Sequence, residues 1–158
     1  MGNYGYSGTN AKNDVWTSND GSNWTQLTPS ANWCPRGAFT SIVFNNKMWI
    51  FGGDPKGSTS EFKNDIWSSS DGVNWTLETP SADWSISAYH SAVIYKSKLF
   101  ILTWNNELWR SINGINWEKV SNAPANSNYC NFIVYNDRVL LYDTNVNSAK
   151  SKVWSYSE

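Results

Sequence analysis

The sequence predicts an all-β fold built from repeated four-stranded antiparallel units, and three observations lead to this prediction. A twelve-residue pattern occurs at residues 13–24, 64–75 and 106–117. Pairs of apolar segments, each pair joined by two residues that suit a turn, occur at residues 40–51, 91–102 and 131–142. The composition, with 11 Trp beside abundant Asn and Ser, suits short strands joined by polar turns and disfavours helices.

The twelve-residue pattern is typical of a β-hairpin. Each copy begins with an apolar residue followed by Trp, passes through Asp-Gly or Asn-Gly, and ends in Asn-Trp. A tight hairpin turn needs positive φ, which Gly adopts freely and Asp or Asn tolerates. We therefore interpret Asp20 and Asp71 as turn residues and not as a pair of catalytic carboxylates.

One apolar pair and one Trp-containing hairpin together make a unit of four short strands. The Trp of the third strand recurs at residues 16, 67, 109 and 154, at spacings of 51, 42 and 45 residues. A four-stranded unit with this period is typical of a β-propeller blade. We expect residues 1–158 to form one propeller segment, with a partial blade at 4–27, complete blades at 39–77 and 90–120, and a partial blade at 130–156.

The two partial blades predict that the ring is closed by association. Residues 4–27 supply the end of a second strand with a third and a fourth, and residues 130–156 supply the first three strands. Propellers usually have 4 to 8 blades, so about three blades leave strand edges exposed. We expect either a fragment of a longer propeller or a homo-oligomer. A homodimer would close about six blades. Residues 14–16 of one copy and 152–154 of the other compete for the same third-strand position, and if neither is displaced the count rises to about eight.

The repeat resembles the kelch repeat of β-propellers. An apolar strand ends in Gly52-Gly53 and is followed by Asn-Asp-apolar-Trp and a later Trp, although only one repeat carries the double glycine. The turns at residues 18–24 and 69–75 also resemble the Asp-box of sialidase-type propellers, but they are one residue shorter, and Asn113 replaces Asp in the third copy. Both resemblances imply a propeller scaffold, and neither identifies a substrate.

Charge and targeting signals exclude some function classes. The chain has 12 basic and 13 acidic side chains without a run of either sign, which disfavours binding to nucleic acid or to an anionic membrane. Neither a signal peptide nor a membrane-spanning segment is visible, so we expect a soluble chain, in a compartment that the sequence does not reveal. Cys34 and Cys130 could form one disulfide, but two free, packed thiols are favoured.

The sequence contains no set of residues that predicts a metal or cofactor site. His90 is the only histidine, and it aligns with Phe39 and Cys130 at the start of the first strand of each unit, so we interpret it as a core or channel-lining residue. The sialidase resemblance suggests a carboxylate-binding arginine triad. However, Arg36, Arg110 and Arg138 fall at different places in the repeat, and we expect them to be solvated surface charges.

The remaining candidates for ligand binding are aromatic. Trp33 and Trp84 lie in the linkers between units and Trp104 lies in a short loop, so we name these three, with His90, as candidate binding residues. The alternative is that the tryptophans fill the space between blades. The favoured function is a non-enzymatic module that binds protein or glycan. The alternatives are a glycan-active enzyme, or part of one, and a structural or engineered scaffold without a ligand.

Overall fold

The structure is a computed structural model and describes residues 11–123, 130–143 and 153–156. It confirms the all-β propeller class. In the described residues the strands form four separate antiparallel sheets, and one loop contains a short 3₁₀ helix, η1 (Thr59–Glu61). The strands are β1 (Val15–Thr17), β2 (Thr25–Thr28), β3 (Thr40–Phe44), β4 (Lys47–Gly53), β5 (Lys63–Ser69), β6 (Thr76–Thr79), β7 (Ser91–Tyr95), β8 (Lys98–Leu102), β9 (Glu107–Ser111), β10 (Glu118–Asn122), β11 (Cys130–Tyr135), β12 (Arg138–Asp143) and β13 (Val153–Tyr156).

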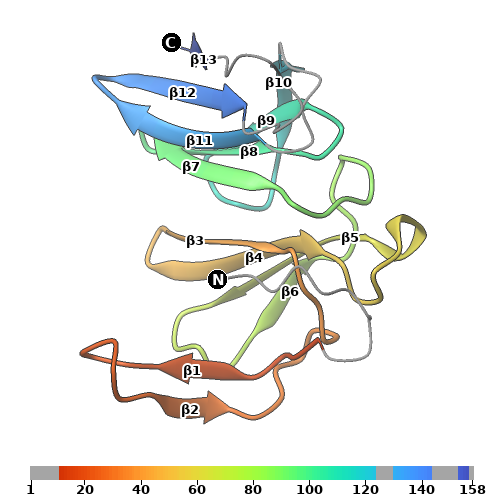
Figure 1. Ribbon diagram of the computed structural model, residues 1–158, viewed down its shortest axis with the longest axis vertical. Helices are drawn as coiled ribbons and strands as arrows, with labels where there is room; N and C mark the ends of the chain where they lie inside the picture. The colour runs from red at the N-terminus through yellow and green to blue at the C-terminus, as the bar shows by residue number, and fades with distance from the viewer. Residues whose placement is uncertain (1–10, 124–129, 144–152, 157–158) are drawn as a thin grey trace.

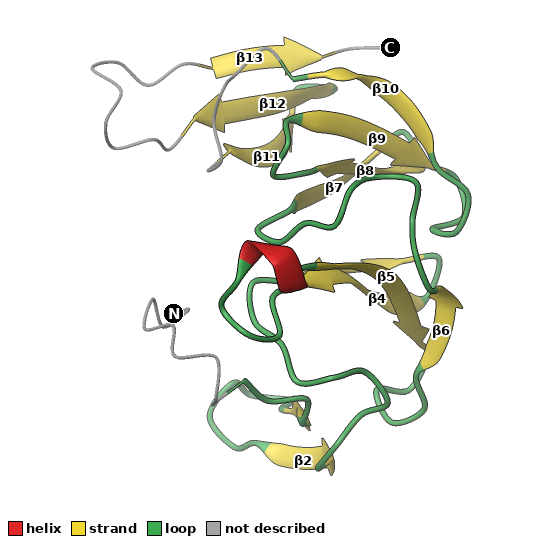
Figure 2. Ribbon diagram, turned by 90° about the vertical axis from the view of Figure 1, so that its right-hand side faces the viewer, coloured by secondary structure: helices red, strands yellow, loops and turns green. Residues whose placement is uncertain are grey.

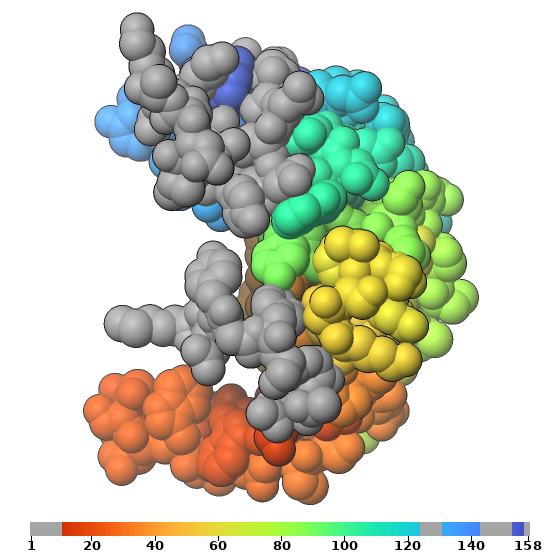
Figure 3. Space-filling model, turned by 45° about the vertical axis from the view of Figure 1, so that its right-hand side comes forward, coloured from red at the N-terminus to blue at the C-terminus, as the bar shows by residue number. Residues whose placement is uncertain are grey.

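The sheets follow one another along an open arc in the order of the chain (Figures 1 and 3). The N-terminal sheet is β1-β2, the second sheet is β3-β4-β5-β6, the third is β7-β8-β9-β10, and the C-terminal sheet is β11-β12-β13. The N-terminal and C-terminal sheets lie at opposite ends of the arc (Figure 1). Part of the N-terminal partial blade expected at residues 4–10 lies outside the described residues.

Successive strands in the two complete sheets run in opposite directions, so their connections gather at two faces of the arc. The loops β4–β5 and β8–β9 and the linkers between sheets lie at one end of the strands, which we call the linker face. The short helix η1 belongs to this group of loops (Figure 2). The two-residue hairpin turns and the Asp-Gly turns lie at the opposite end, which we call the turn face.

The turn-face hairpins form for the reasons that the sequence suggests. Asn45 and Asn46 both have positive φ, of 50° and 58°, as a two-residue turn between twisted strands requires. In the Asp-Gly turn, the Asp71 carboxylate accepts hydrogen bonds from the side chain and backbone of Asn74 and from the backbone of Val73, at 2.8 Å each. These bonds hold the pKa of Asp71 far below its usual value. Asp20 and Asn113 occupy the same position in the other two turns.

The hydrophobic core lies between the sheets. The largest cluster joins the second and third sheets, and another joins the N-terminal sheet to the second. The first contains Phe44, Trp49, Phe51, Ile66, Ala82, Trp84, Leu99, Ile101, Trp109 and Trp117, and the other contains Ala31, Trp33, Ile50 and Trp75. Stability therefore depends on contact between neighbouring sheets. Among the described residues, no helix has the length and apolar character needed to cross a bilayer.

Candidate binding surface

The first two linkers between sheets are each held by an asparagine that begins the twelve-residue pattern. The side-chain amide of Asn64 donates to the carbonyl oxygens of Ala82 and Trp84, at 3.1 and 2.9 Å. Asn13 makes the same two bonds to residues 31 and 33, at 2.9 and 3.0 Å. The two copies share this geometry, which explains why Asn precedes the acidic residue in both. The asparagine ties the linker to the third strand of the sheet that the linker leaves.

The two linker tryptophans pack on the sheet that follows them. Trp84 is 1% exposed and meets Trp117 edge to face, with ring centroids 5.0 Å apart. Trp33 is 4% exposed and meets Trp75 in the same way at 4.4 Å. Both side chains are therefore buried, in agreement with the alternative that the tryptophans fill the space between blades. They fill the space between blades, because each linker must close an apolar junction.

His90 lies in the same junction as Trp84, with ring centroids 6.3 Å apart. Its imidazole is buried, and neither ring nitrogen has a hydrogen-bond partner among the described residues. Burial lowers the pKa of His90 to about 4, so the ring is neutral at physiological pH. A Cβ added to Gly52 would lie 2.6 Å from the backbone oxygen of Lys63 and 2.7 Å from Cε1 of His90, which explains why glycine occupies this position.

The surroundings of His90 support its interpretation as a core residue. Thr40 donates its hydroxyl to the backbone carbonyl of His90 and joins the first strands of the second and third sheets. Among the side chains that the structure describes, no group of three or more His, Cys, Asp and Glu residues could hold a metal ion. The side chain of Cys130, which aligns with His90 in sequence, lies outside the description.

Arg36 corrects the expectation that the arginines are solvated surface charges. Its guanidinium is buried, makes a two-pronged ion pair with Asp65 at 2.5 and 2.8 Å, and donates to the carbonyl of Gly52 at 3.0 Å. Burial alone raises the pKa of Asp65, but hydrogen bonds from Arg36 and Trp67 outweigh this effect, and the pKa lies below its ordinary value. Arg36 thus fixes a linker to the sheet that follows.

Cys34 is free and exposed, so the expectation of a packed thiol is wrong for this residue. Its Sγ lies 3.2 Å from the Arg36 guanidinium.

Trp104 is the sequence-predicted aromatic residue that lies in a surface loop. It is half-buried, and its ring centroid lies 5.3 Å from that of Tyr89, which lies 6.4 Å from Phe62. The three rings form an aromatic cluster on the linker face, which we call the Phe62–Tyr89–Trp104 cluster. It joins the β4–β5 loop, the linker before β7 and the β8–β9 loop.

The backbone beneath this cluster is fixed by hydrogen bonds. The amide of Tyr89 donates to the carbonyl of Ala38 at 2.8 Å, and the amide of Trp104 donates to Oγ of Ser87 at 3.1 Å. Tyr89 has a φ of 57°, which is strained for a bulky residue, and Ala38 has the same conformation, with a φ of 51°, at the equivalent place in the preceding linker. Both linkers therefore share this backbone conformation, but only the second linker has an aromatic side chain, Tyr89, at this position.

The structure separates the four residues predicted to bind a ligand into three places. Trp84 and His90 share one buried junction, Trp33 lies in another, and Trp104 lies on the linker face. Sequence reasoning missed Phe62 and Tyr89. Their only signal was an aromatic residue next to a loop, which many residues of this chain share.

The comparisons with known proteins agree with this architecture. A family model described as the DUF6242 beta propeller domain matches residues 35–158. The solved structure of YjhT resembles the chain with a TM-score of 0.64 at 13% sequence identity. That similarity covers 90% of this chain and 52% of the YjhT chain, so this chain spans about half the length of the structure that it matches. No curated protein matches the sequence significantly. The chain belongs to the DUF6242 β-propeller domain family.

Proposed function

We propose that this domain is a non-enzymatic binding module that presents its linker face to a protein or glycan ligand. The Phe62–Tyr89–Trp104 cluster carries the proposal. Tyr89 and Trp104 are half-buried, so part of each aromatic side chain is accessible, and their loops are held by backbone hydrogen bonds. Aromatic side chains on a rigid support lose little conformational entropy on binding, which is why they dominate many binding sites.

Polar groups of the same loops could supply specificity. Asn105 is exposed next to Trp104, and Ser58 and Ser60 are exposed in the loop that carries η1. Stacking on an aromatic ring combined with a few hydrogen bonds suits a sugar ring or a short peptide loop. The two buried linker tryptophans have no part in this proposal, and His90 contributes only by supporting the backbone next to Tyr89.

The test is a screen of the purified chain on a glycan array and a displayed peptide library, followed by calorimetry with the selected glycan or peptide. Replacing Trp104 with Ala should weaken binding by roughly tenfold or more, since a central aromatic contact is worth more than about 1 kcal/mol. Ile112→Ala is the control, because Ile112 is 71% exposed on the turn face. If Trp104→Ala binds as tightly as the wild type, or if neither library gives a ligand, the proposal is wrong.

We also infer that the repeats are of the kelch type with Asp-box-like turns. In support, Gly52 and Gly53 both have positive φ, of 53° and 113°, at the end of β4. In the turn, Oγ of Ser69 accepts from the amide of Gly72 at 2.9 Å, and the Asp71 carboxylate accepts from the two residues that follow the glycine. A family comparison that aligns these positions across many chains would test the inference. It predicts that the serine and the acidic or amide residue recur in each repeat.

A further inference from the structure

The two ends of the arc present surfaces that are buried at every interior junction. Trp75 and Trp117 end the twelve-residue pattern in the second and third sheets, and they are 7% and 9% exposed. Trp24 has the same place in the N-terminal sheet and is 58% exposed. The turn glycines differ in the same way. A Cβ on Gly114 would lie 2.7 Å from the Trp49 ring of the preceding sheet, whereas a Cβ on Gly21 would meet nothing within 4 Å.

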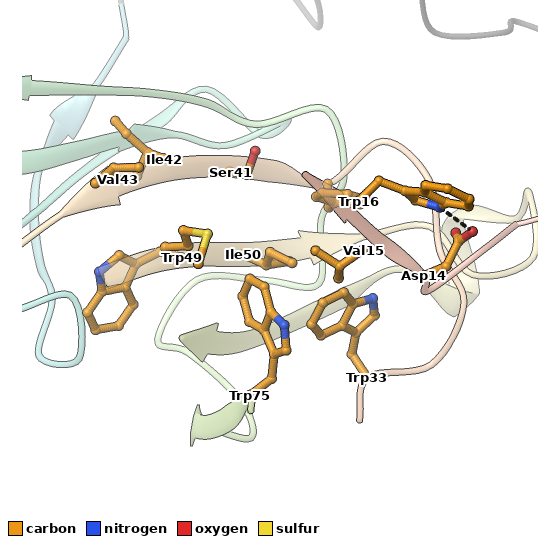
Figure 4. Close-up of a pocket in the computed structure, with 12 residues that line it drawn as sticks. Asp14, Val15, Trp16, Trp33, Ser41, Ile42, Val43, Trp49, Ile50 and Trp75 are labelled. Atoms are coloured by element: carbon orange, nitrogen blue, oxygen red, sulfur yellow. Dashed lines mark hydrogen bonds between the residues drawn. The ribbon is translucent and has the colours of Figure 1, made fainter. Parts of the chain in front are cut away.

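The N-terminal sheet also lacks its inner strands among the described residues. β5 and β9 each pair with a second strand of the same sheet, whereas among residues 11–123, 130–143 and 153–156 the one partner of β1 is β2. A groove of about 450 Å³ lies beside β1 and along the second sheet (Figure 4). Its apolar lining includes Val15, Phe39, Val43, Ile50 and Trp75. Val43 is 63% exposed, whereas its equivalent in the third sheet, Ile94, which has a complete sheet before it, is 38% exposed.

The C-terminal sheet has the strands that the N-terminal sheet lacks. It consists of an inner hairpin, β11-β12, and the third strand β13, without a described fourth strand. Ile133 and Tyr135 of β11 are 45% and 62% exposed. In the second sheet, the residue equivalent to Ile133 is Ile42, which packs against the cluster that contains the next sheet. The exposed face of β11 is therefore the face that an interior blade turns towards its following neighbour.

The strand pairing fixes how the two ends would join. Within the second sheet Ile50 of β4 pairs with Trp67, and within the third sheet Ile101 pairs with Trp109. In the C-terminal sheet Leu141 of β12 pairs with Trp154 of β13 in the same register. Trp16 of β1 is the equivalent tryptophan and is 48% exposed. Strands β1 and β13 are therefore alternative partners for the same edge of β12.

A second unfilled space supports this arrangement. An apolar cavity of about 220 Å³ lies between the third and C-terminal sheets, lined by Phe100, Leu108, Val139, Leu141, Trp154 and Tyr156. Phe100 aligns with Trp49, which in the interior junction contacts the turn glycine of the following sheet. Within the part of the chain that the structure describes, the Gly21–Trp24 turn has no such partner, since a Cβ on Gly21 would meet nothing within 4 Å.

We propose that two copies of this chain close one ring by exchanging this strand pairing. The β11-β12 hairpin of one copy lies in the groove beside β1 of the other, β1 displaces β13 from the edge of β12, and Leu141 of one copy pairs with Trp16 of its partner. Each copy then contributes about three blades to a ring of about six. The closed ring buries Trp24 as the interior junctions bury Trp75 and Trp117, it covers the groove beside Val43, and it pairs the edge strand at each end of the arc. This proposal is independent of the ligand proposed for the linker face.

A disulfide trap tests the register directly. In a background with Cys34→Ser and Cys130→Ser, we would introduce Thr17→Cys and Leu140→Cys, the positions equivalent to the pair Ser68 and Trp49 within the second sheet. Oxidation should give a disulfide-linked dimer on a non-reducing gel, and a reductant should convert it to monomer. Only two chains paired through β1 and β12 bring the two cysteines together. Thr17→Cys with Arg138→Cys is the control. It is two residues out of register, about 7 Å along the strand, and should form much less of the dimer.

Solution mass gives a second, independent measurement. Light scattering over a range of concentrations should show a mass of two chains. Val43→Glu should shift the midpoint of the monomer–dimer transition to at least roughly tenfold higher protein concentration, because the substitution places a charge in the apolar groove. Val73→Glu is the control, since Val73 is 45% exposed outside the groove. A mass of one chain at every concentration, an association that Val43→Glu does not weaken, or equal trapping by the in-register and out-of-register pairs would overturn the proposal.

Discussion

His90 shows how one side chain can make the stability of the whole fold depend on pH. The buried ring has a pKa of about 4, against an ordinary value of 6.5, because burial disfavours its charged form. The unfolded chain therefore binds a proton at a higher pH than the folded chain does. The contribution of the neutral His90 ring to the free energy of unfolding is fully present above pH 6.5 and is lost as the pH falls from 6.5 towards 4. A difference of this size corresponds to about 3 kcal/mol.

The prediction uses the residue that the second sheet has at the same place, Phe39. His90→Phe should reduce the loss of the free energy of unfolding between pH 7 and pH 4 by about 3 kcal/mol relative to the wild type. Urea unfolding, followed by tryptophan fluorescence at a series of pH values, measures this difference. His90 is the only histidine in the sequence, so no other imidazole contributes. Parallel pH profiles for the two proteins would show that His90 is protonated equally in the folded and unfolded chains.

The pair Arg36 and Asp65 is the second residue-scale feature with a measurable consequence. Removing one partner of a buried ion pair leaves a buried charge without compensation, which typically costs about 3 kcal/mol. Asp65→Asn should therefore lower the free energy of unfolding by about that amount. The double variant Arg36→Met/Asp65→Leu should lose less stability than the single variants Arg36→Met and Asp65→Leu lose together, as a double-mutant cycle in urea would reveal. Strict additivity would mean that the two side chains stabilise the fold separately.

At the scale of the elements, the Asp-Gly turns act as contacts between sheets as well as reversals of the chain. Gly21 and Gly114 have similar φ values, of 73° and 81°, so replacing either with Ala introduces the same kind of backbone strain. Only at Gly114 would the added Cβ meet a buried ring, that of Trp49. Gly21→Ala should therefore cost about 1 kcal/mol, and Gly114→Ala about 1–3 kcal/mol more.

Thermal or urea unfolding of the two glycine variants measures this difference, with both proteins at a concentration low enough to keep the chain monomeric. Equal losses of stability would mean that the turn contributes nothing to the junction between the second and third sheets.

The elements were predictable from the sequence to the extent that they depend on local rules. The hairpins at residues 40–51 and 64–79 follow from short apolar segments rich in β-branched and aromatic residues and from turns that need positive φ. Burial was less predictable, because it depends on which element covers which. Trp84 and Trp104 both lie between strands in the sequence, but the first closes a junction and the second lies on a loop surface. Likewise, Arg36 reaches Asp65 across 29 residues, and no short-range pattern marks that contact.

At the scale of the whole molecule, stability should rise from the N-terminal end of the arc to its middle. Strands β4 and β8 lie at the centres of the two complete sheets, and most of their side chains are buried. Strands β1 and β2 form a separate two-stranded sheet, and most of their residues are exposed. Amides in β4 and β8 should therefore exchange with solvent only through global unfolding, whereas those in β1 and β2 should exchange through local opening.

Hydrogen exchange measured by mass spectrometry over a range of protein concentrations checks this gradient. In dilute solution the peptide that contains residues 15–28 should exchange fastest among the strands of the first three sheets. In the closed ring it should become protected as the concentration rises, since β1 would then pair on both edges. Slow exchange of this peptide in a demonstrable monomer would mean that the N-terminal sheet is already covered within one chain.

The linkers have a consequence for how such an assembly transmits force. The linkers that contain Trp33 and Trp84 are each tied by an asparagine to the sheet that they leave and by a tryptophan to the sheet that they enter. A mechanical domain of this protein therefore does not coincide with a sheet. Each mechanical domain comprises the third and fourth strands of one blade, the linker, and the last hairpin of the next blade, which the linker tryptophan contacts. Tension along the chain would be shared between neighbouring blades, so that the arc should yield by losing a junction before any single sheet unravels.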